Sequence, residues 1–166
     1  VVLADLGLNL PDFRAGERAF QLLCQVVGRS GRGSATGRAI IQTYDPTHYA
    51  VSAAAAQKYQ DFYDQEIALR SRYQQPPFWR LVRLVFQHYN LSYCQNETEK
   101  ISKILRSKIN IAEHGVVGPA PAFPERVRGL HRWHLLLRTK NDPTDLLRNL
   151  KLRDGWHIDV DPVSLT

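Results

Sequence analysis

The stretch that decides the fold class is RLVRLVFQHY, residues 80–89. Its valine, leucine and aromatic side chains predict a strand, and Pro76-Pro77 upstream sets its beginning. The segments that follow predict a helix over 96–112, a short strand over 116–118, a strand over 133–139, a helix after Asp142 and a last strand over 156–160. This β-α-β-β-α-β order predicts an α+β domain, with one sheet and two helices on one of its faces.

Two blocks precede this domain. Residues 47–77 are rich in alanine and aromatic residues at helical spacing, which predicts a helical connector that ends at the prolines. Residues 1–46 predict a strand, a helix over 17–27 that ends at Gly28, a glycine-rich loop and a strand over 38–44. We therefore expect boundaries at 1–46, 47–77 and 78–166, with an α/β first block.

The composition narrows the class of protein. Of the 166 residues, 43% are hydrophobic and 23% are charged, which is typical of a globular chain rather than a disordered one. No apolar run approaches the length of a membrane helix, and no signal peptide opens the chain. Cys24 and Cys94 lie far apart, which favours a reducing compartment and a cytoplasmic location. With no methionine and an apolar start, the chain is expected to be a fragment of a longer protein.

The net charge of +6 and the pI near 9.5 favour a polyanionic partner such as nucleic acid. A solvated basic surface would produce the same values, so charge leaves both interpretations open.

The segment QVVGRSGRG, residues 25–33, is the motif that carries chemistry. Arg29 and Arg32 follow a helix and can project in one direction, and arginine presents a fork of donors suited to phosphate oxygens. The glycines remove side-chain bulk, so the backbone can approach a ligand closely. The alternative is a glycine-rich turn with solvated arginines, and spacing alone leaves the two about even.

This segment resembles motif VI of superfamily-two helicases, whose pattern is Gln-x-x-Gly-Arg-x-Gly-Arg. The flanking sequence resembles the PriA family of replication-restart DNA helicases, also called primosomal protein N′. The patches that carry the resemblance are residues 5–15, 17–18, 41–46, 63–66, 76–78, 80–84, 117–121, 128–129, 132–133 and 159–162. Because several patches occur in the family's order, the resemblance is much more specific than motif VI alone.

The resemblance implies that residues 1–46 form the end of a second RecA-like helicase lobe. It implies that Arg32 acts as an arginine finger with Arg29 as its partner, that Gln25 contacts nucleotide phosphate, and that Gly28 and Gly31 are spacers. ATP with Mg²⁺ would be the cofactor of the parent protein. The chain lacks a phosphate-binding loop and an acidic metal box, so the fragment alone is not expected to hydrolyse ATP. The family's zinc-binding cysteines are also absent, so no metal site is expected here.

The resemblance further implies an ATP-dependent 3′→5′ DNA helicase that restarts replication. Its partners would be stalled or branched DNA, single-stranded DNA, single-stranded DNA-binding protein, other primosome proteins and the replicative helicase. The competing hypothesis is a stand-alone module that binds nucleic acid or protein without a motor.

Basic residues surround Trp133 and form the candidate DNA-binding set. They are Arg126, Arg128, Arg132, His134, Arg138 and Lys140. Cations can follow phosphates while an aromatic ring stacks on a base. However, alternation in a strand places Trp133, Leu135 and Leu137 on one face, which favours a buried Trp133 and a DNA-facing opposite face.

Three other features have simpler interpretations. His131 and His134 point to opposite faces of a strand, so they are not expected to share a metal ion. Asp159 and Asp161 are expected to share a face as two exposed acids, with a catalytic carboxylate pair as the second alternative. Cys24 lies on the apolar stripe of its helix and is expected to pack in the core.

Overall fold

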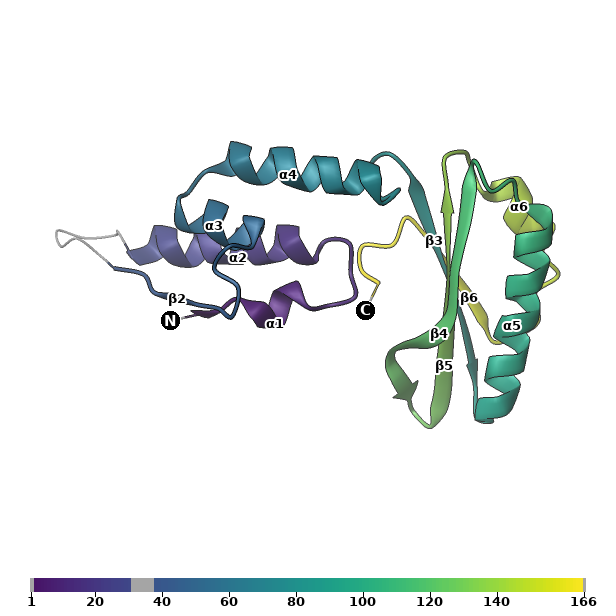
Figure 1. The fold of residues 1–166 in the computed structure, drawn as a ribbon. Coiled ribbons are helices and arrows are strands. Elements are labelled where there is room, and N and C mark those ends of the chain that lie inside the picture. Colours follow the sequence, from purple (N-terminus) through teal and green to yellow (C-terminus); the bar gives the residue numbers. More distant parts are fainter. Residues whose placement is uncertain (1, 31–37, 166) are drawn as a thin grey trace. The chain divides into compact units, whose positions relative to one another are not determined.

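The computed structural model describes residues 2–30 and 38–165 (Figure 1). The chain divides into two compact units, which we call unit 1, Val1–Tyr73, and unit 2, Gln74–Thr166. Each unit is described by itself.

Unit 2 contains one antiparallel sheet. Its strands are β3 (Arg80–His88), β4 (His114–Val127), β5 (Leu130–Thr139) and β6 (Trp156–Val160), in the spatial order β4-β5-β3-β6. The helices α5 (Leu91–Lys108) and α6 (Thr144–Arg148) lie on the same side of the sheet (Figure 1). Strand β5 lies between β3 and β4, and strand β3 lies between β5 and β6. The units β3-α5-β4 and β5-α6-β6 are therefore two split β-α-β units that interlock in one sheet. The predicted β-α-β-β-α-β order is confirmed.

The core of unit 2 lies between the sheet and the helices. Val82 and Leu84 of β3 pack with Leu135 and Leu137 of β5, and all four are fully buried. Ile101, Leu105 and Leu150 cover them from the helix side. We call this side of the sheet the helix face. The alternate residues form the second face, which contains Leu81, Arg83, Val85, Arg132, His134, Leu136 and Arg138.

Helix α5 begins and ends earlier than the predicted range of 96–112. The Asn90 side chain accepts a hydrogen bond from the Tyr93 amide at 2.9 Å and caps a helix that begins at Leu91, five residues before the predicted start. Ile109 has extended backbone dihedral angles, which end the helix at Lys108.

Strand β4 is much longer than the predicted 116–118. It continues beyond the expected end at residue 118 and runs through a segment that contains Pro119, Pro121 and Pro124. The register shifts between Val117 and Ala120 and again between Pro121 and Arg126. An edge strand with such irregularities tolerates proline, because not every amide must donate to a neighbouring strand.

Unit 1 is mainly helical. Its helices are α1 (Asp5–Leu8), α2 (Ala15–Ser30), α3 (Tyr49–Ala55) and α4 (Tyr59–Arg72). Phe20 of α2 stacks on Phe62 of α4 with ring centroids 4.1 Å apart, and Leu23 and the alanines of α3 complete the core. The helices of the segment expected to be a connector, 47–77, therefore share a core with α2. Cys24 packs against this core, as its position predicted.

Two local predictions in unit 1 are wrong. Gly28 does not end its helix, because α2 continues to Ser30. One glycine costs a helix about 1 kcal/mol relative to alanine, which the packing of α2 can offset. The strand expected over 38–44 is reduced to β2 (Ile41–Gln42), which pairs in parallel with β1 (Val2–Leu3). Beyond it, the Asp5 carboxylate accepts hydrogen bonds from Thr43 and Tyr44, so side-chain contacts replace the ladder.

Within residues 2–30 and 38–165, no helix combines the length and the hydropathy that crossing a bilayer requires.

Candidate nucleic-acid interface and the motif on helix α2

The pairing of β3 with β5 brings basic side chains together on the second face. His134 lies opposite Val85, Leu136 lies opposite Arg83, and Arg138 lies opposite Leu81. Arg83 is therefore the diagonal neighbour of both His134 and Arg138. Arg132, one step further along β5, belongs to the same face. The sequence predicted Arg132, His134, Arg138 and Lys140 on one side of the strand, and the register confirms this for the first three, since Lys140 follows the end of β5.

The electrostatics of His134 show that these cations affect one another. Its pKa is lowered from the ordinary 6.5, mainly by burial and further by repulsion from Arg83 and Arg132. His134 is therefore mostly neutral at pH 7 within a positive environment. A phosphate oxygen on this face would be attracted by the arginines and would favour protonated His134.

Arg83 is the residue of this group that sequence reasoning missed. It is 7% exposed and lies near the middle of β3, within a run of apolar residues. A single arginine between valine and leucine in a central strand was the available signal. Its relation to His134 depends on which strand is the neighbour of β5, and the sequence does not state this.

The arginines near the turn between β4 and β5 form a second group at the hairpin tip. Arg126 donates from Nε to the Gly129 carbonyl at 3.4 Å, and Arg132 donates to the Pro124 carbonyl at 3.1 Å. Arg128 has a φ of 50° and Gly129 a φ of 85°, so the turn uses the left-handed region. Arg126 and Arg128 are exposed.

Lys140 lies apart from this tip. Eight residues of strand separate it from Arg132, which corresponds to about 26 Å. Its ammonium lies 5.3 Å from the centre of the Trp79 ring, an intramolecular cation–π contact. The six predicted DNA-binding residues therefore follow the length of β5 and its hairpin rather than forming one compact cluster.

Trp133 lies on the helix face, where it is the register partner of Phe86. It is half-buried, and Leu135 and Leu137 on the same face are fully buried. Trp133 therefore lies on the face of β5 that was predicted to be buried, and its ring is not on the face that carries His134.

The α2 motif is described only up to Ser30, and Gly31 and Arg32 lie outside the described residues. Gln25, Gly28 and Arg29 are exposed on the last two turns of α2. Gln25 and Arg29 are four residues apart and therefore share a side of the helix. No atom lies within 4 Å of the position that a Cβ at Gly28 would take.

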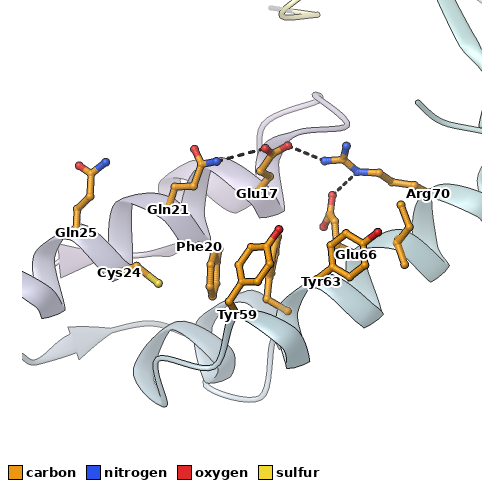
Figure 2. Close-up of a pocket in the computed structure, with 11 residues that line it drawn as sticks. Glu17, Phe20, Gln21, Cys24, Gln25, Tyr59, Tyr63, Glu66 and Arg70 are labelled. Atoms are coloured by element: carbon orange, nitrogen blue, oxygen red, sulfur yellow. Dashed lines mark hydrogen bonds and ion pairs between the residues drawn. The ribbon is translucent and has the colours of Figure 1, made fainter. Parts of the chain in front are cut away.

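Gln25 also borders a pocket of about 400 Å³ between α2 and α4 (Figure 2). Phe20 and Cys24 of α2 face the rings of Tyr59 and Tyr63 on α4, while Gln25 continues the row of Glu17 and Gln21 along α2. The remaining lining residues are Phe62, Glu66, Ile67 and Arg70.

The charged side chains of this pocket bind one another. Arg70 contacts Glu17 at 2.8 Å and Glu66 at 2.7 Å, and the Tyr49 hydroxyl donates to Glu66 at 2.6 Å. Burial and the nearby Glu66 raise the pKa of Tyr49 well above its usual 10, so it remains a donor. This network joins α2 to α4 and explains why the two helices stay together.

Two features considered for metal or acid–base chemistry have other roles. The β5 register places His131 and His134 on opposite faces, as predicted. Asp159 and Asp161 are both exposed, as predicted. Asp161 lies just beyond β6, and its carboxylate contacts Arg80 at 2.7 Å. Among the described residues, no three His, Cys, Asp or Glu side chains are grouped to hold a metal ion.

Comparison with known proteins agrees with this architecture. The family described as the primosomal protein N C-terminal domain matches residues 71–163, which include the whole sheet of unit 2. Replication restart protein PriA of Treponema pallidum is 36% identical over 173 residues and covers 99% of the chain. The PriA proteins of Chlamydia muridarum and Bacillus subtilis are 33% and 34% identical and cover 99% and 86% of the chain.

The fold of unit 2 and the family match together identify the chain as the C-terminal region of a primosomal protein. The chain belongs to the PriA family, as the motif resemblance predicted. It spans 18 to 26% of the length of these three relatives.

Proposed function

We propose that this chain is the C-terminal portion of a replication-restart DNA helicase, and that unit 2 binds DNA phosphates through the second face and the β4–β5 hairpin. The observation that carries the proposal is the register that places Arg83, Arg132 and His134 on one face of the sheet. Burial mainly, and the two arginines in addition, lower the pKa of His134 there. A surface rich in one sign of charge attracts a ligand of the opposite sign, and DNA offers a regular row of phosphates.

The role proposed for the parent protein rests on the family. The relatives are named replication restart proteins. A cytoplasmic ATP-dependent helicase that binds stalled or branched forks and single-stranded DNA would fit that name. Single-stranded DNA-binding protein, primosome proteins and the replicative helicase would be its partners.

For unit 1, we propose that residues 1–46 complete a second RecA-like lobe. Arg29 and Arg32 would contact ATP that is held, with Mg²⁺, mainly by upstream parts of the protein. The exposed position of Gln25 and Arg29 on one side of α2 supports this role. Guanidinium groups at this position would stabilise negative charge on the phosphates.

The DNA proposal is tested by fluorescence anisotropy of the chain with forked and single-stranded DNA at low and high salt. We expect Arg132→Ala/Arg138→Ala to weaken binding and to lower the salt slope by about 1.4 to 1.8, because two phosphate contacts are lost. Lys100→Ala/Lys103→Ala is the matched control, since it removes the same charge from exposed positions on α5. Equal losses in both variants would show that net charge rather than the second face binds DNA.

The ATP proposal is tested in the full-length protein. Arg32→Ala should reduce ATP hydrolysis by about 10³- to 10⁵-fold, the range known for arginine fingers, while DNA binding persists. Unchanged hydrolysis would favour the alternative, a binding module without a contribution to the motor. The separate core of unit 2 is the observation that supports that alternative.

A further inference from the structure

The exposed aromatic ring near the arginines of the hairpin tip is Phe123, not Trp133. Phe123 is 60% exposed, whereas its neighbour Ala122 is 2% exposed and anchors the strand. Phe123 lies within the second register shift of β4, between Pro121 and Arg126. Irregularities of this kind commonly redirect a side chain out of the sheet.

The surroundings of Phe123 are strongly basic. Residues 123–132 contain three arginines and one acid, Glu125. The Arg132 guanidinium donates to the carbonyl of Pro124, so it lies next to the backbone of Phe123. Arg126 and Arg128 are exposed around the same turn.

Two side-chain hydrogen bonds support the backbone of the hairpin near Phe123. Arg132 connects β5 to the irregular part of β4, and Arg126 closes the turn onto the Gly129 carbonyl. The free end of the hairpin bends away from α5, toward the side of the second face (Figure 1). The exposed ring therefore belongs to the same projecting hairpin as the exposed Arg126 and Arg128.

We propose that Phe123 stacks on an unpaired base of single-stranded DNA whose phosphates contact Arg126, Arg128 and Arg132. This inference rests on the proposed DNA-binding function and assigns it a stacking residue. An exposed ring offers a flat apolar surface that any base can cover, so the contact would not depend on sequence. Loss of one such contact weakens single-strand binding by about 5- to 150-fold.

The test uses the 166-residue chain and a single-stranded oligonucleotide that contains one 2-aminopurine, whose fluorescence responds to stacking. Phe123→Ala and Phe123→Leu should both lose the fluorescence change and bind about tenfold more weakly, because neither side chain has a π face. Phe123→Trp should retain both signals. Phe78→Ala is the matched control, since Phe78 is 48% exposed and lies just before β3, away from the hairpin.

The salt dependence separates stacking from charge. Phe123→Ala should leave the slope of log affinity against log salt unchanged, because it removes no phosphate contact. Arg132→Ala should lower that slope by about 0.7 for single-stranded DNA. Each variant's tryptophan fluorescence confirms that unit 2 is folded.

Wild-type affinity and an unchanged 2-aminopurine signal in Phe123→Ala would overturn the stacking inference. The proposed DNA-binding function would survive that result if Arg132→Ala/Arg138→Ala still weakened binding. If the wild-type chain bound no oligonucleotide at low salt, both proposals would be overturned.

Discussion

Unit 1 buries its core between helices, whereas unit 2 buries its core between helices and a continuous sheet. The only ladder described in unit 1, β1 with β2, joins two residue pairs, while β3 and β5 of unit 2 are paired over nine. Unit 1 therefore depends on ring packing and on the Arg70 ion-pair network, and unit 2 depends on backbone pairing over a fully buried apolar layer. Interactions of the first kind open more easily, so we expect faster amide exchange in unit 1.

The tryptophans allow the two units to be followed separately. Trp79, Trp133 and Trp156 all belong to unit 2, and the chain has three tryptophans in total. Intrinsic tryptophan fluorescence therefore reports the unfolding of unit 2, and hydrogen exchange of α2 and α4 reports unit 1.

The largest effect is expected from Leu135→Ala. Leu135 is fully buried in β5, so its truncation should lower the free energy of unfolding of unit 2 by about 2 to 5 kcal/mol. Urea unfolding followed by tryptophan fluorescence measures this loss. Leu136→Ala, on the second face, is the control and should cost less. A parallel rise of amide exchange in α2 would contradict the separation into two cores.

Arg70→Ala is the corresponding substitution in unit 1 and should lower the stability of that unit. Its side chain is 13% exposed and contacts two carboxylates, so its loss leaves the buried Glu66 without its cation. We expect a loss of about 2 kcal/mol, measured by exchange of α2 and α4 amides. Arg72→Ala, an exposed residue of the same helix, should have little effect. If the urea midpoint measured by tryptophan fluorescence were lower in Arg70→Ala, the network would also stabilise unit 2.

Gly28→Ala should strengthen unit 1 slightly. The site is helical and has room for a Cβ, so alanine should stabilise α2 by up to about 1 kcal/mol. Slower amide exchange in α2 would show this. If Gly28 is the spacer that the family resemblance implies, the same change in the full-length protein should reduce ATP hydrolysis. Destabilised α2 amides would mean that the helix does not extend through Gly28.

The smallest expected effect is a dependence of the stability of unit 2 on pH. The pKa of His134 is lowered in the folded state, so the unfolded chain binds a proton first as pH falls through 6.5. Burial mainly, and then Arg83 and Arg132, oppose that proton in the folded state. His157 and Asp159 of β6 belong to the same face. The stability contributed by neutral His134 is present above pH 6.5 and is lost below it.

His134→Gln should therefore flatten the fall in the urea midpoint between pH 7 and pH 5.5. Tryptophan fluorescence measures both proteins under the same conditions, so the titration of other groups cancels in the difference. Identical pH profiles would show that His134 titrates as it does in the unfolded chain.

Features that depend on near neighbours were predictable. The alternation around Trp133 separated the helix face from the second face correctly, because side-chain direction in a strand has a period of two residues. Strand β6 was predicted at its observed bounds. The segment around Pro121 was misjudged, because proline is tolerated only where no neighbouring strand needs its amide, and that depends on the strand's place in the sheet.

By itself, the sequence determined the family, the element order of unit 2 and the face of β5 that carries Arg132 and His134. These follow from motifs, spacing and periodicity, which are local properties of the chain. Tertiary structure alone decided that Arg83 joins that face and that Phe123 is exposed within the irregular part of β4. Both depend on strand order and register, because pairing brings together residues far apart in the chain, and a register shift changes where a side chain points.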